Sequence, residues 1–289
     1  MSRSTAGVVL AFQPDETILA NVTRLRRQVE RVYVVNNSPG DERTAELLGR
    51  LASAQGTVVL DQTDNVGVAA GFNAGMRQAL TDGFDYVWIF DQDSTVADGM
   101  LGQLLRAFAE WPEPVAIAGP ALRAEETGFL YDADRGEGIG ARPTLISSGA
   151  LFSREALERI GLHDERLFID YVDHDISLRA GAAGFAVVKV FDTILDHRFG
   201  ASTASVFFGR RIYLSNYSPM RQYYMARNRV VMIRRHGLGG WFREDLAYTT
   251  KAWIKVLLCE RRRGKKIGAA VRGTIDGIRF REPRSIVDR

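Results

Sequence analysis

Short apolar runs rich in β-branched and aromatic residues alternate with helical segments through the first 120 residues. The runs predict strands at residues 8–12, 32–35, 57–60, 86–90 and 115–118. Apolar residues with helical spacing predict helices at residues 15–28, 42–54, 72–80 and 101–111. This alternation predicts an α/β fold in which helices cover both faces of a mostly parallel central sheet. Ligands of such sheets bind at the carboxyl ends of the strands, so residues that follow the strands are the first site candidates.

Asp91 and Asp93 come directly after the strand expected at residues 86–90. Because successive residues of an extended chain alternate sides, both carboxylates can point the same way. Two carboxylates that lie together repel each other unless a cation or a shared proton relieves the repulsion. Mg²⁺ or Mn²⁺ fits such oxygen ligands and usually brings a phosphate group with it. A solvated turn is the alternative interpretation, since Asp and Ser are common in turns.

Three glycines spaced four residues apart, Gly67, Gly71 and Gly75, open the helix that leads to residue 80. They would line one helical face and let a backbone or a ligand approach closely. The pattern matches neither the dinucleotide-binding nor the P-loop motif. Tight helix–sheet packing explains the glycines, whereas Asn65 and Asn73 add side-chain amides that packing does not require.

A second acidic cluster contains Asp170, Asp173 and Asp175 within six residues, flanked by apolar residues. Asp175 and Arg179 have the i,i+4 spacing of a helical ion pair. Asp173 is then available to act as a base. His174 is expected to be a surface or packing residue. A lone histidine further along the chain is usually structural, although a neutral imidazole can complete a metal shell.

The net charge of +3 conceals an acidic body and a basic tail. Residues 205–289 hold 20 Lys and Arg but only 6 Asp and Glu, whereas residues 1–204 hold 18 and 29. We therefore expect the tail to face an anionic partner, such as nucleic acid or anionic lipid. The single cysteine excludes an internal disulfide framework and a cysteine-rich metal site, which fits a reducing compartment. Neither a signal peptide nor a transmembrane helix is expected.

The basic tail also carries an apolar helical stripe made by Leu246, Thr250, Trp253 and Leu257. The cluster at residues 261–266 contains five basic residues. A basic amphipathic helix is typical of membrane-surface elements. A helix packed on its own catalytic domain explains the stripe equally well, and exposed aromatic and amphipathic helices would also allow a homodimer.

Several short motifs, taken together and in their order, resemble family 2 glycosyltransferases with a GT-A fold over roughly residues 7–235. The motifs are residues 34–38, 65–75, 91–93, 148–150, 168–179 and 197–202. Within this family the segments 168–173 and 223–229 are most similar to those of bacterial rhamnosyltransferases. The resemblance implies a catalytic domain at residues 1–205 and a helical, basic C-terminal region at residues 206–289.

The resemblance further implies an inverting, metal-dependent transfer of a sugar, and the favoured donor is dTDP-L-rhamnose, which supplies L-rhamnose. The implied acceptor is a saccharide or a lipid-linked saccharide. The implied process is cell-surface polysaccharide synthesis, such as that of O-antigen. Asp173 would be the catalytic base, and Asp91, Asp93 and His197 would hold Mg²⁺ or Mn²⁺. The expected donor-binding residues are Phe12, Asn36, Ser38, Asn65, Gly67, Gly71, Asn73, Asp91, Gln92, Asp93 and Arg227. The expected acceptor-side residues are Ser148, Gly149, Asp170, Asp175, Tyr224 and Asn228. The expected location is cytoplasmic, with possible peripheral contact to the inner face of the cell membrane.

Asn36 departs from the family pattern, which usually carries an aspartate there for recognition of the nucleotide base. An amide both donates and accepts hydrogen bonds, whereas an ionised carboxylate only accepts them. A family 2 enzyme that uses another nucleoside-diphosphate sugar therefore remains an alternative. A nucleotidyltransferase is disfavoured because no basic residue follows the first strand. A non-catalytic nucleic-acid-binding protein is disfavoured by the acidic body, so no nucleic-acid partner is expected.

Overall fold

The computed structural model describes residues 4–124, 128, 130, 134–197, 203–207 and 210–281. The chain forms two compact units. The first contains residues 1–168 and 172–199, and the second contains residues 169–171 and 200–289. The compact units thus divide near residue 199, while the functional division expected at residue 205 remains a prediction.

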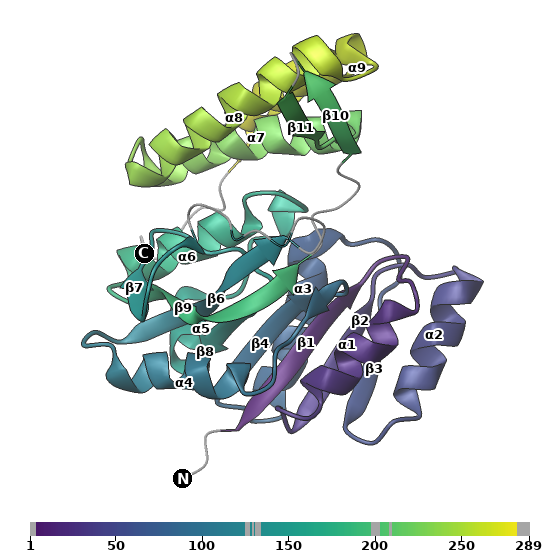
Figure 1. Cartoon of the computed structure of the whole chain (residues 1–289), viewed down its shortest axis with the longest axis vertical. Coiled ribbons are helices and arrows are strands. Elements are labelled where there is room, and N and C mark those ends of the chain that lie inside the picture. Colours follow the sequence, from purple (N-terminus) through teal and green to yellow (C-terminus); the bar gives the residue numbers. More distant parts are fainter. Residues whose placement is uncertain are drawn as a thin grey trace. The chain divides into compact units, whose positions relative to one another are not determined.

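The first unit is built on one mixed sheet with the strand order β3-β2-β1-β4-β8-β6-β9-β5, and β7 pairs with β9 (Figure 1). The strands are β1 Thr5–Ala11, β2 Arg31–Asn36, β3 Thr57–Asp61, β4 Tyr86–Asp91, β5 Ser94–Thr95, β6 Val115–Ala124, β7 Ile139–Ala141, β8 Ala150–Ser153 and β9 Ala186–His197. The first four lie parallel, as does the β6–β9 pair. β8 runs antiparallel to β4 and β6, so the sheet reverses direction beyond β4.

Helices cover both faces of this sheet because neighbouring residues of each strand face opposite sides. In β4, Trp88 and Phe90 belong to one buried cluster and Val87 and Ile89 to the other. The first cluster takes in α1 Thr17–Leu25, α2 Glu42–Ala52 and α4 Met100–Glu110. The second takes in α3 Gly67–Thr81, α5 Arg154–Ile160 and α6 Val172–Ala182. The predicted α/β architecture is confirmed.

The second unit consists of a hairpin, β10 Thr203–Phe207 with β11 Arg210–Leu214, and three helices. The helices are α7 Pro219–His236, α8 Gly240–Cys259 and α9 Arg263–Arg279. α9 packs closely on α7, since a Cβ atom at Gly273 would lie 2.2 Å from the Tyr223 carbonyl oxygen. In the described ranges no helix has the length and apolar character needed to cross a bilayer.

Candidate active site

The carboxyl ends of β1, β2 and β4 are tied together by side-chain hydrogen bonds. The Phe12 N–H donates to Gln92 Oε1 at 2.7 Å, and Gln92 Nε2 donates back to the Phe12 carbonyl at 3.0 Å. The Gln13 N–H donates to Ser38 Oγ at 2.6 Å. The loops after these strands therefore form one connected edge. Gln92 uses its amide to hold this edge, and the donor contact expected for it stays a prediction. The Phe12 ring is exposed there.

The polar residues after β2 support one another. Asn36 Oδ1 accepts the Ser38 N–H at 3.0 Å, and Asn36 Nδ2 donates to Asp61 Oδ1 at 2.8 Å. Asn36 and Ser38 are almost fully buried, whereas Asp61 is exposed at the end of β3. The expected donor-binding pair thus lies at the correct edge of the sheet, together with a carboxylate that the sequence did not suggest.

The glycines of α3 serve packing, as one of the two sequence interpretations held. A Cβ atom at Gly71 would lie 2.4 Å from the Leu10 side chain, and one at Gly75 would lie 2.4 Å from Val8. Gly67 has a φ of +83° and leaves no room for a Cβ atom beside the Phe168 ring. Gly71 and Gly75 let α3 approach β1 closely, and Gly67 lets it approach Phe168. The donor contacts expected of Gly67 and Gly71 stay predictions.

Asn73 has a structural role, and its expected role in donor binding stays a prediction. Its side chain is buried, donates to the His163 carbonyl at 2.8 Å and accepts the His163 N–H at 3.0 Å. Asn65 closes the turn before α3, because its Oδ1 accepts the Gly67 N–H at 3.0 Å. Asn65 remains exposed, so its donor-binding role stays a prediction.

The acidic pair lies at the end of β4. Asp91 is opposite Leu10 of β1, and its N–H donates to Ser148 Oγ at 3.1 Å. Ser148 Oγ also lies 2.6 Å from Ser94 Oγ. Ser94 in turn pairs with His197 across the β5–β9 ladder, which brings the His197 backbone next to the acidic pair. The His197 side chain lies outside the described residues, so its predicted metal contact is neither supported nor opposed.

Asp91 and Asp93 are both half-buried and supply hard carboxylate oxygens from the end of one strand. This donor chemistry fits Mg²⁺ or Mn²⁺. Among the residues whose side chains are described, no cluster of three His, Cys, Asp or Glu forms a complete protein-only cage. A magnesium or manganese ion bound through one or two carboxylates completes its shell with water and phosphate oxygens, so such a cage is not required.

Asp173 lies in the first turn of α6 and is held by its neighbour. His174 Nδ1 lies 2.9 Å from Asp173 Oδ1, and the His174 backbone N–H donates to the same oxygen at 2.9 Å. Burial raises the pKa of the Asp173 carboxyl, but the His174 charge and these hydrogen bonds outweigh burial and hold that pKa below its usual value. Asp173 is therefore ionised and oriented at neutral pH, as a general base must be.

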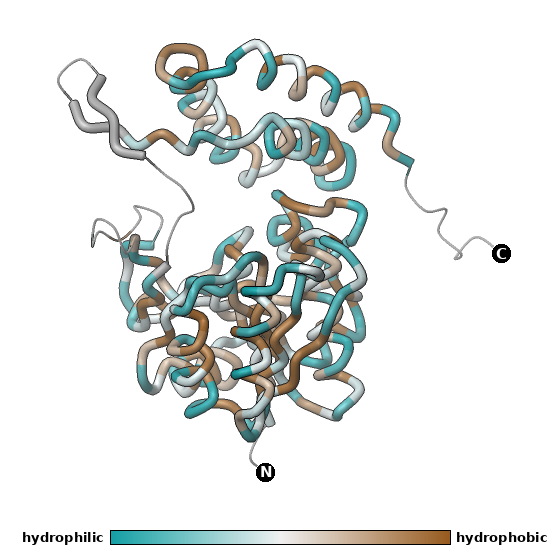
Figure 2. The backbone as a smooth tube through the Cα atoms, turned by 90° about the vertical axis from the view of Figure 1, so that its right-hand side faces the viewer, coloured by the Kyte–Doolittle hydropathy of each residue, from teal (hydrophilic) through white to brown (hydrophobic). Residues whose placement is uncertain are grey.

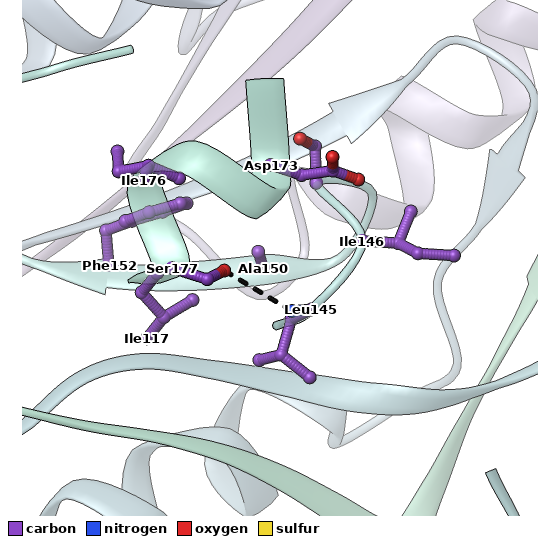
Figure 3. A pocket seen from close by; sticks show the side chains of 9 residues that line it. Ile117, Leu145, Ile146, Ala150, Phe152, Asp173, Ile176 and Ser177 are labelled. Atoms are coloured by element: carbon purple, nitrogen blue, oxygen red, sulfur yellow. Dashed lines mark hydrogen bonds between the residues drawn. The ribbon is translucent and has the colours of Figure 1, made fainter. Parts of the chain in front are cut away.

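Asp173 borders a small depression whose other lining residues are mostly apolar (Figure 3). Ser147 and Ala150 line the same depression. Between them, Ser148 Oγ accepts the Asp91 N–H and lies 2.6 Å from Ser94 Oγ, so one short segment contacts the end of β4 and also lines the depression beside Asp173. Gly149 permits this, because its φ is +81° and a Cβ atom there would lie 2.9 Å from Pro120 and Leu195. We therefore regard residues 147–150 as the link between the two halves of the site.

Asp175 has a structural role in place of the expected acceptor contact. Its side chain is fully buried and pairs with Arg179 at 2.8 Å, as the i,i+4 spacing predicted. Arg179 Nη2 also donates to the Leu162 carbonyl at 2.7 Å. The pair therefore anchors α6 to the loop before it.

Within the second unit, residues 169–171 form hydrogen bonds and an ion pair with side chains of α7 and α8. Asn228 is fully buried, and its Nδ2 donates to the Ile169 and Asp170 carbonyls at 2.8 and 2.9 Å. Asp170 forms an ion pair with Arg221 at 2.9 Å, and the Tyr171 hydroxyl donates to Asp245. These contacts offset the strain of a φ of +64° at both Asp170 and Tyr171. Asn228 and Asp170 thus have structural roles, and their expected acceptor contacts stay predictions.

Arg227 and Tyr224 also belong to the second unit. The Arg227 guanidinium lies 4.7 Å from the centroid of the Tyr224 ring and 5.6 Å from that of Phe280. Both residues are partly exposed. The expected roles of Arg227 in donor binding and of Tyr224 on the acceptor side stay predictions.

A family model described as "Glycosyl transferase family 2" matches residues 8–161, which is more than half of the chain. The chain belongs to glycosyl transferase family 2. The matched range contains the carboxyl edge of β1, β2 and β4, the acidic pair and residues 147–150. The sequence-based assignment to this family of glycosyltransferases is confirmed.

Two curated relatives match most of this glycosyltransferase. The dTDP-rhamnosyl transferase RfbF of Shigella flexneri is 28% identical over 251 residues, which cover 82% of each chain. The galactofuranosyltransferase GlfT1 of Mycobacterium tuberculosis is 27% identical over 261 residues, which cover 82% of this chain and 84% of GlfT1.

Two solved structures show the fold that this glycosyltransferase shares. S. aureus TarS 1–349 in complex with UDP-GlcNAc has a TM-score of 0.65 at 14% identity, covering 92% of this chain and 79% of the other. The mannosyltransferase PcManGT from Pyrobaculum calidifontis, in complex with GDP-Man and Mn²⁺, has a TM-score of 0.60 at 15% identity, covering 96% and 76%. The likeness confirms the GT-A fold.

Two residues of this family 2 enzyme were missed at the sequence level. His174 was expected on a surface or in packing, yet it orients Asp173. Asp61 was not among the predicted site residues, yet it accepts a hydrogen bond from Asn36. Adjacency to Asp173 was a usable signal for His174. No local signal existed for Asp61, because only the register of β2 against β3 brings it beside Asn36.

Proposed function

We propose that this glycosyltransferase inverts the configuration of a sugar that it moves from a nucleoside diphosphate to an acceptor hydroxyl, in cell-surface polysaccharide synthesis. The favoured donor is dTDP-L-rhamnose and the favoured acceptor is a saccharide or a lipid-linked saccharide. The observation that carries the proposal is the segment 147–150, in which Ser148 accepts the Asp91 N–H while Ser147 and Ala150 line the depression beside Asp173.

In the proposed reaction the acceptor oxygen attacks the anomeric carbon of the donor sugar. Asp173 takes the proton of that hydroxyl, a new C–O bond forms, and the bond between the anomeric carbon and the diphosphate oxygen breaks. The nucleoside diphosphate leaves with the electron pair. A bound Mg²⁺ or Mn²⁺ would supply Lewis-acid neutralisation of the leaving diphosphate. Asp91 and Asp93 would hold that ion, and Ser148 fixes the Asp91 backbone.

The nucleoside would bind at the edge formed after β1, β2 and β3. Asn36, Ser38 and Asn65 lie there, and the exposed Phe12 ring offers an apolar surface beside them. The similarity to RfbF, a dTDP-rhamnosyl transferase, supports the rhamnosyl donor. GlfT1, at similar identity, supports a galactofuranosyl donor as the alternative. Both alternatives share the same chemistry at Asp173 and at the acidic pair.

A panel of nucleoside-diphosphate sugars with Mg²⁺, Mn²⁺ or chelator tests the donor by thermal unfolding. At about 100 times its dissociation constant, the true donor should stabilise the fold by roughly 2.7 kcal/mol. We expect dTDP-L-rhamnose with a divalent cation to give the largest stabilisation. If no sugar nucleotide in the panel stabilises the chain, the proposed transfer is wrong.

A second proposal concerns location: α9 lies on an anionic membrane surface. Four large apolar residues of α9, Ile267, Val271, Ile275 and Ile278, are 40–64% exposed and share one helical face. Figure 2 shows hydrophobic and hydrophilic residues alternating along the helix that leads to the C-terminus. The opposite face is occupied, since Gly273 and Gly277 pack on the α7 backbone.

Basic residues flank the exposed apolar face of α9. Lys265, Arg272 and Arg279 are exposed, and among the described residues none of the three makes an ion pair. Within the basic cluster at residues 261–266, Lys266 is buried against Glu260 and is therefore not part of this surface. Basic residues beside an apolar helical face suit an anionic bilayer. A second copy of the chain suits it less well, because pairing this face with itself brings like charges together.

Flotation of the full chain with vesicles tests this location. We expect binding to vesicles with 30% phosphatidylglycerol and weak binding to pure phosphatidylcholine. Lys265→Gln with Arg272→Gln should weaken binding by about 2 kcal/mol, about 1 kcal/mol for each charge. The matched pair Arg43→Gln with Arg50→Gln, on exposed positions of α2, should leave binding unchanged. Equal binding to anionic and neutral vesicles would reject the membrane contact. Concentration-dependent dimers without vesicle binding would reject it as well.

A further inference from the structure

The Asn36 amide donates a hydrogen bond to a carboxylate on the neighbouring strand. Asn36 stands where the resemblance places an aspartate for base recognition. Its Oδ1 accepts the Ser38 N–H at 3.0 Å and its Nδ2 donates to Asp61 Oδ1 at 2.8 Å. The orientation of this amide is set by its partners, because a backbone N–H only donates and an ionised carboxylate only accepts.

Asp61 is placed by the sheet itself. β2 and β3 are parallel, and their register puts Asn36 directly beside Asp61 at the carboxyl ends of both strands. The Gln62 N–H donates to the Asn36 carbonyl at 3.0 Å, which extends this pairing one residue beyond β3. Asp61 is exposed, and no bond to its Oδ2 is recorded within the described part of the chain. One carboxylate oxygen therefore accepts the bond from Asn36, and the residue as a whole is exposed at the end of β3.

We infer that Asp61, through its pair with Asn36, recognises the imide edge of a thymine or uracil base. This inference rests on the proposed function, because it assigns the base of the donor. Asp61 Oδ2 would accept the N3–H of the base. Asn36 Nδ2 keeps a second N–H, which would donate to the adjacent base carbonyl. The pair thus presents an acceptor and a donor side by side, as the imide edge requires.

The same pair selects against cytosine. Cytosine presents an unprotonated N3 and an amino group, so its ring nitrogen would meet the carboxylate as acceptor against acceptor. The carboxylate that the family places on the second strand is, in this chain, supplied from the third strand. The change of residue at position 36 therefore preserves recognition of an N–H group and moves it by one strand.

Isothermal calorimetry of the full chain with nucleoside diphosphates, with no sugar attached, tests the inference separately from catalysis. The wild-type chain should bind dTDP more tightly than dCDP, and more tightly than N3-methyl-dTDP, which lacks the N3–H. Removing a hydrogen bond to a charged group should cost about tenfold or more. Asp61→Asn should lose this preference for dTDP over the N3-methyl compound. Glu46→Gln, an equal loss of charge on exposed α2, should keep it.

Three outcomes decide the matter. Equal affinity of Asp61→Asn for dTDP and N3-methyl-dTDP, with an unchanged melting curve, supports recognition through Asp61. Retention of the wild-type preference in Asp61→Asn overturns the inference while leaving sugar transfer intact. If the wild-type chain binds no nucleoside diphosphate at all, the inference and the proposed function both fall.

Discussion

Replacing Asp173 by asparagine is expected to lower kcat by about 10² to 10⁴, the usual contribution of a general base. The amide cannot take the acceptor proton, while its size and its place in the first turn of α6 are unchanged. Because the proposed donor site is the edge after β1 to β4, we expect thermal stabilisation by the sugar nucleotide to survive. Single-turnover transfer, measured beside thermal unfolding with donor, separates the two effects.

The pH dependence of the wild-type enzyme provides a check on the same residue. His174 and the backbone hydrogen bond hold the pKa of Asp173 below its usual value. The base is therefore already ionised at pH 5, and its loss is expected only as the pH falls through that lowered pKa. Replacing His174 by glutamine should move the acid limb of the kcat profile to higher pH. A merely structural role for His174 would leave that limb in place.

An equal change elsewhere controls for the loss of one negative charge. Asp98→Asn alters an exposed residue in the loop before α4 and should keep wild-type turnover. Near-native turnover of Asp173→Asn would show that another group removes the proton. Loss of both turnover and donor stabilisation would point instead to a collapse of the α6 start.

Local patterns in the sequence were sufficient to predict features that lie within a single strand or helix. The buried run of β4 ends at Asp91 as expected, because continuous apolar residues demand burial on both faces of a sheet. The Asp175–Arg179 pair followed from helical spacing alone. The helical spacing of Asp175 and Arg179 also fits the observed place of Asp173 in the first turn of α6.

Contacts between distant segments could not be predicted in this way. Ser148 reaches Asp91 across 57 residues, and Asn73 reaches His163 across 90. Neither has a periodic signal, since both depend on how β8 and the loop before α6 return to the sheet. The structural contacts of buried Asn73 were therefore not predicted, and the antiparallel insertion of β8 was not anticipated from the β-α alternation.

Replacing Asp93 by asparagine should remove a different part of the reaction. Metal neutralisation of a leaving diphosphate contributes several kcal/mol to transition-state stability. At 1.36 kcal/mol per tenfold, loss of the ion corresponds to roughly 10² to 10⁴ in rate. Unlike Asp173→Asn, this variant should also lose the additional stabilisation that a divalent cation confers on the donor complex. Asp91→Asn is expected to behave in the same way.

The contrast between Asp93→Asn and Asp173→Asn tests whether the acidic pair holds the metal ion and Asp173 acts as the base. Thermal unfolding with dTDP-L-rhamnose, in Mn²⁺ and in chelator, should show a metal-dependent shift for wild type, Asp173→Asn and Asp98→Asn. The same shift should vanish for Asp93→Asn, although its unfolding without ligand is unchanged. If Asp93→Asn retained the metal-dependent shift, the acidic pair would be a solvated turn after β4 and the diphosphate would need another partner. Residues 147–150 would then connect the Asp173 region to a structural turn, and the proposed active site would be rejected.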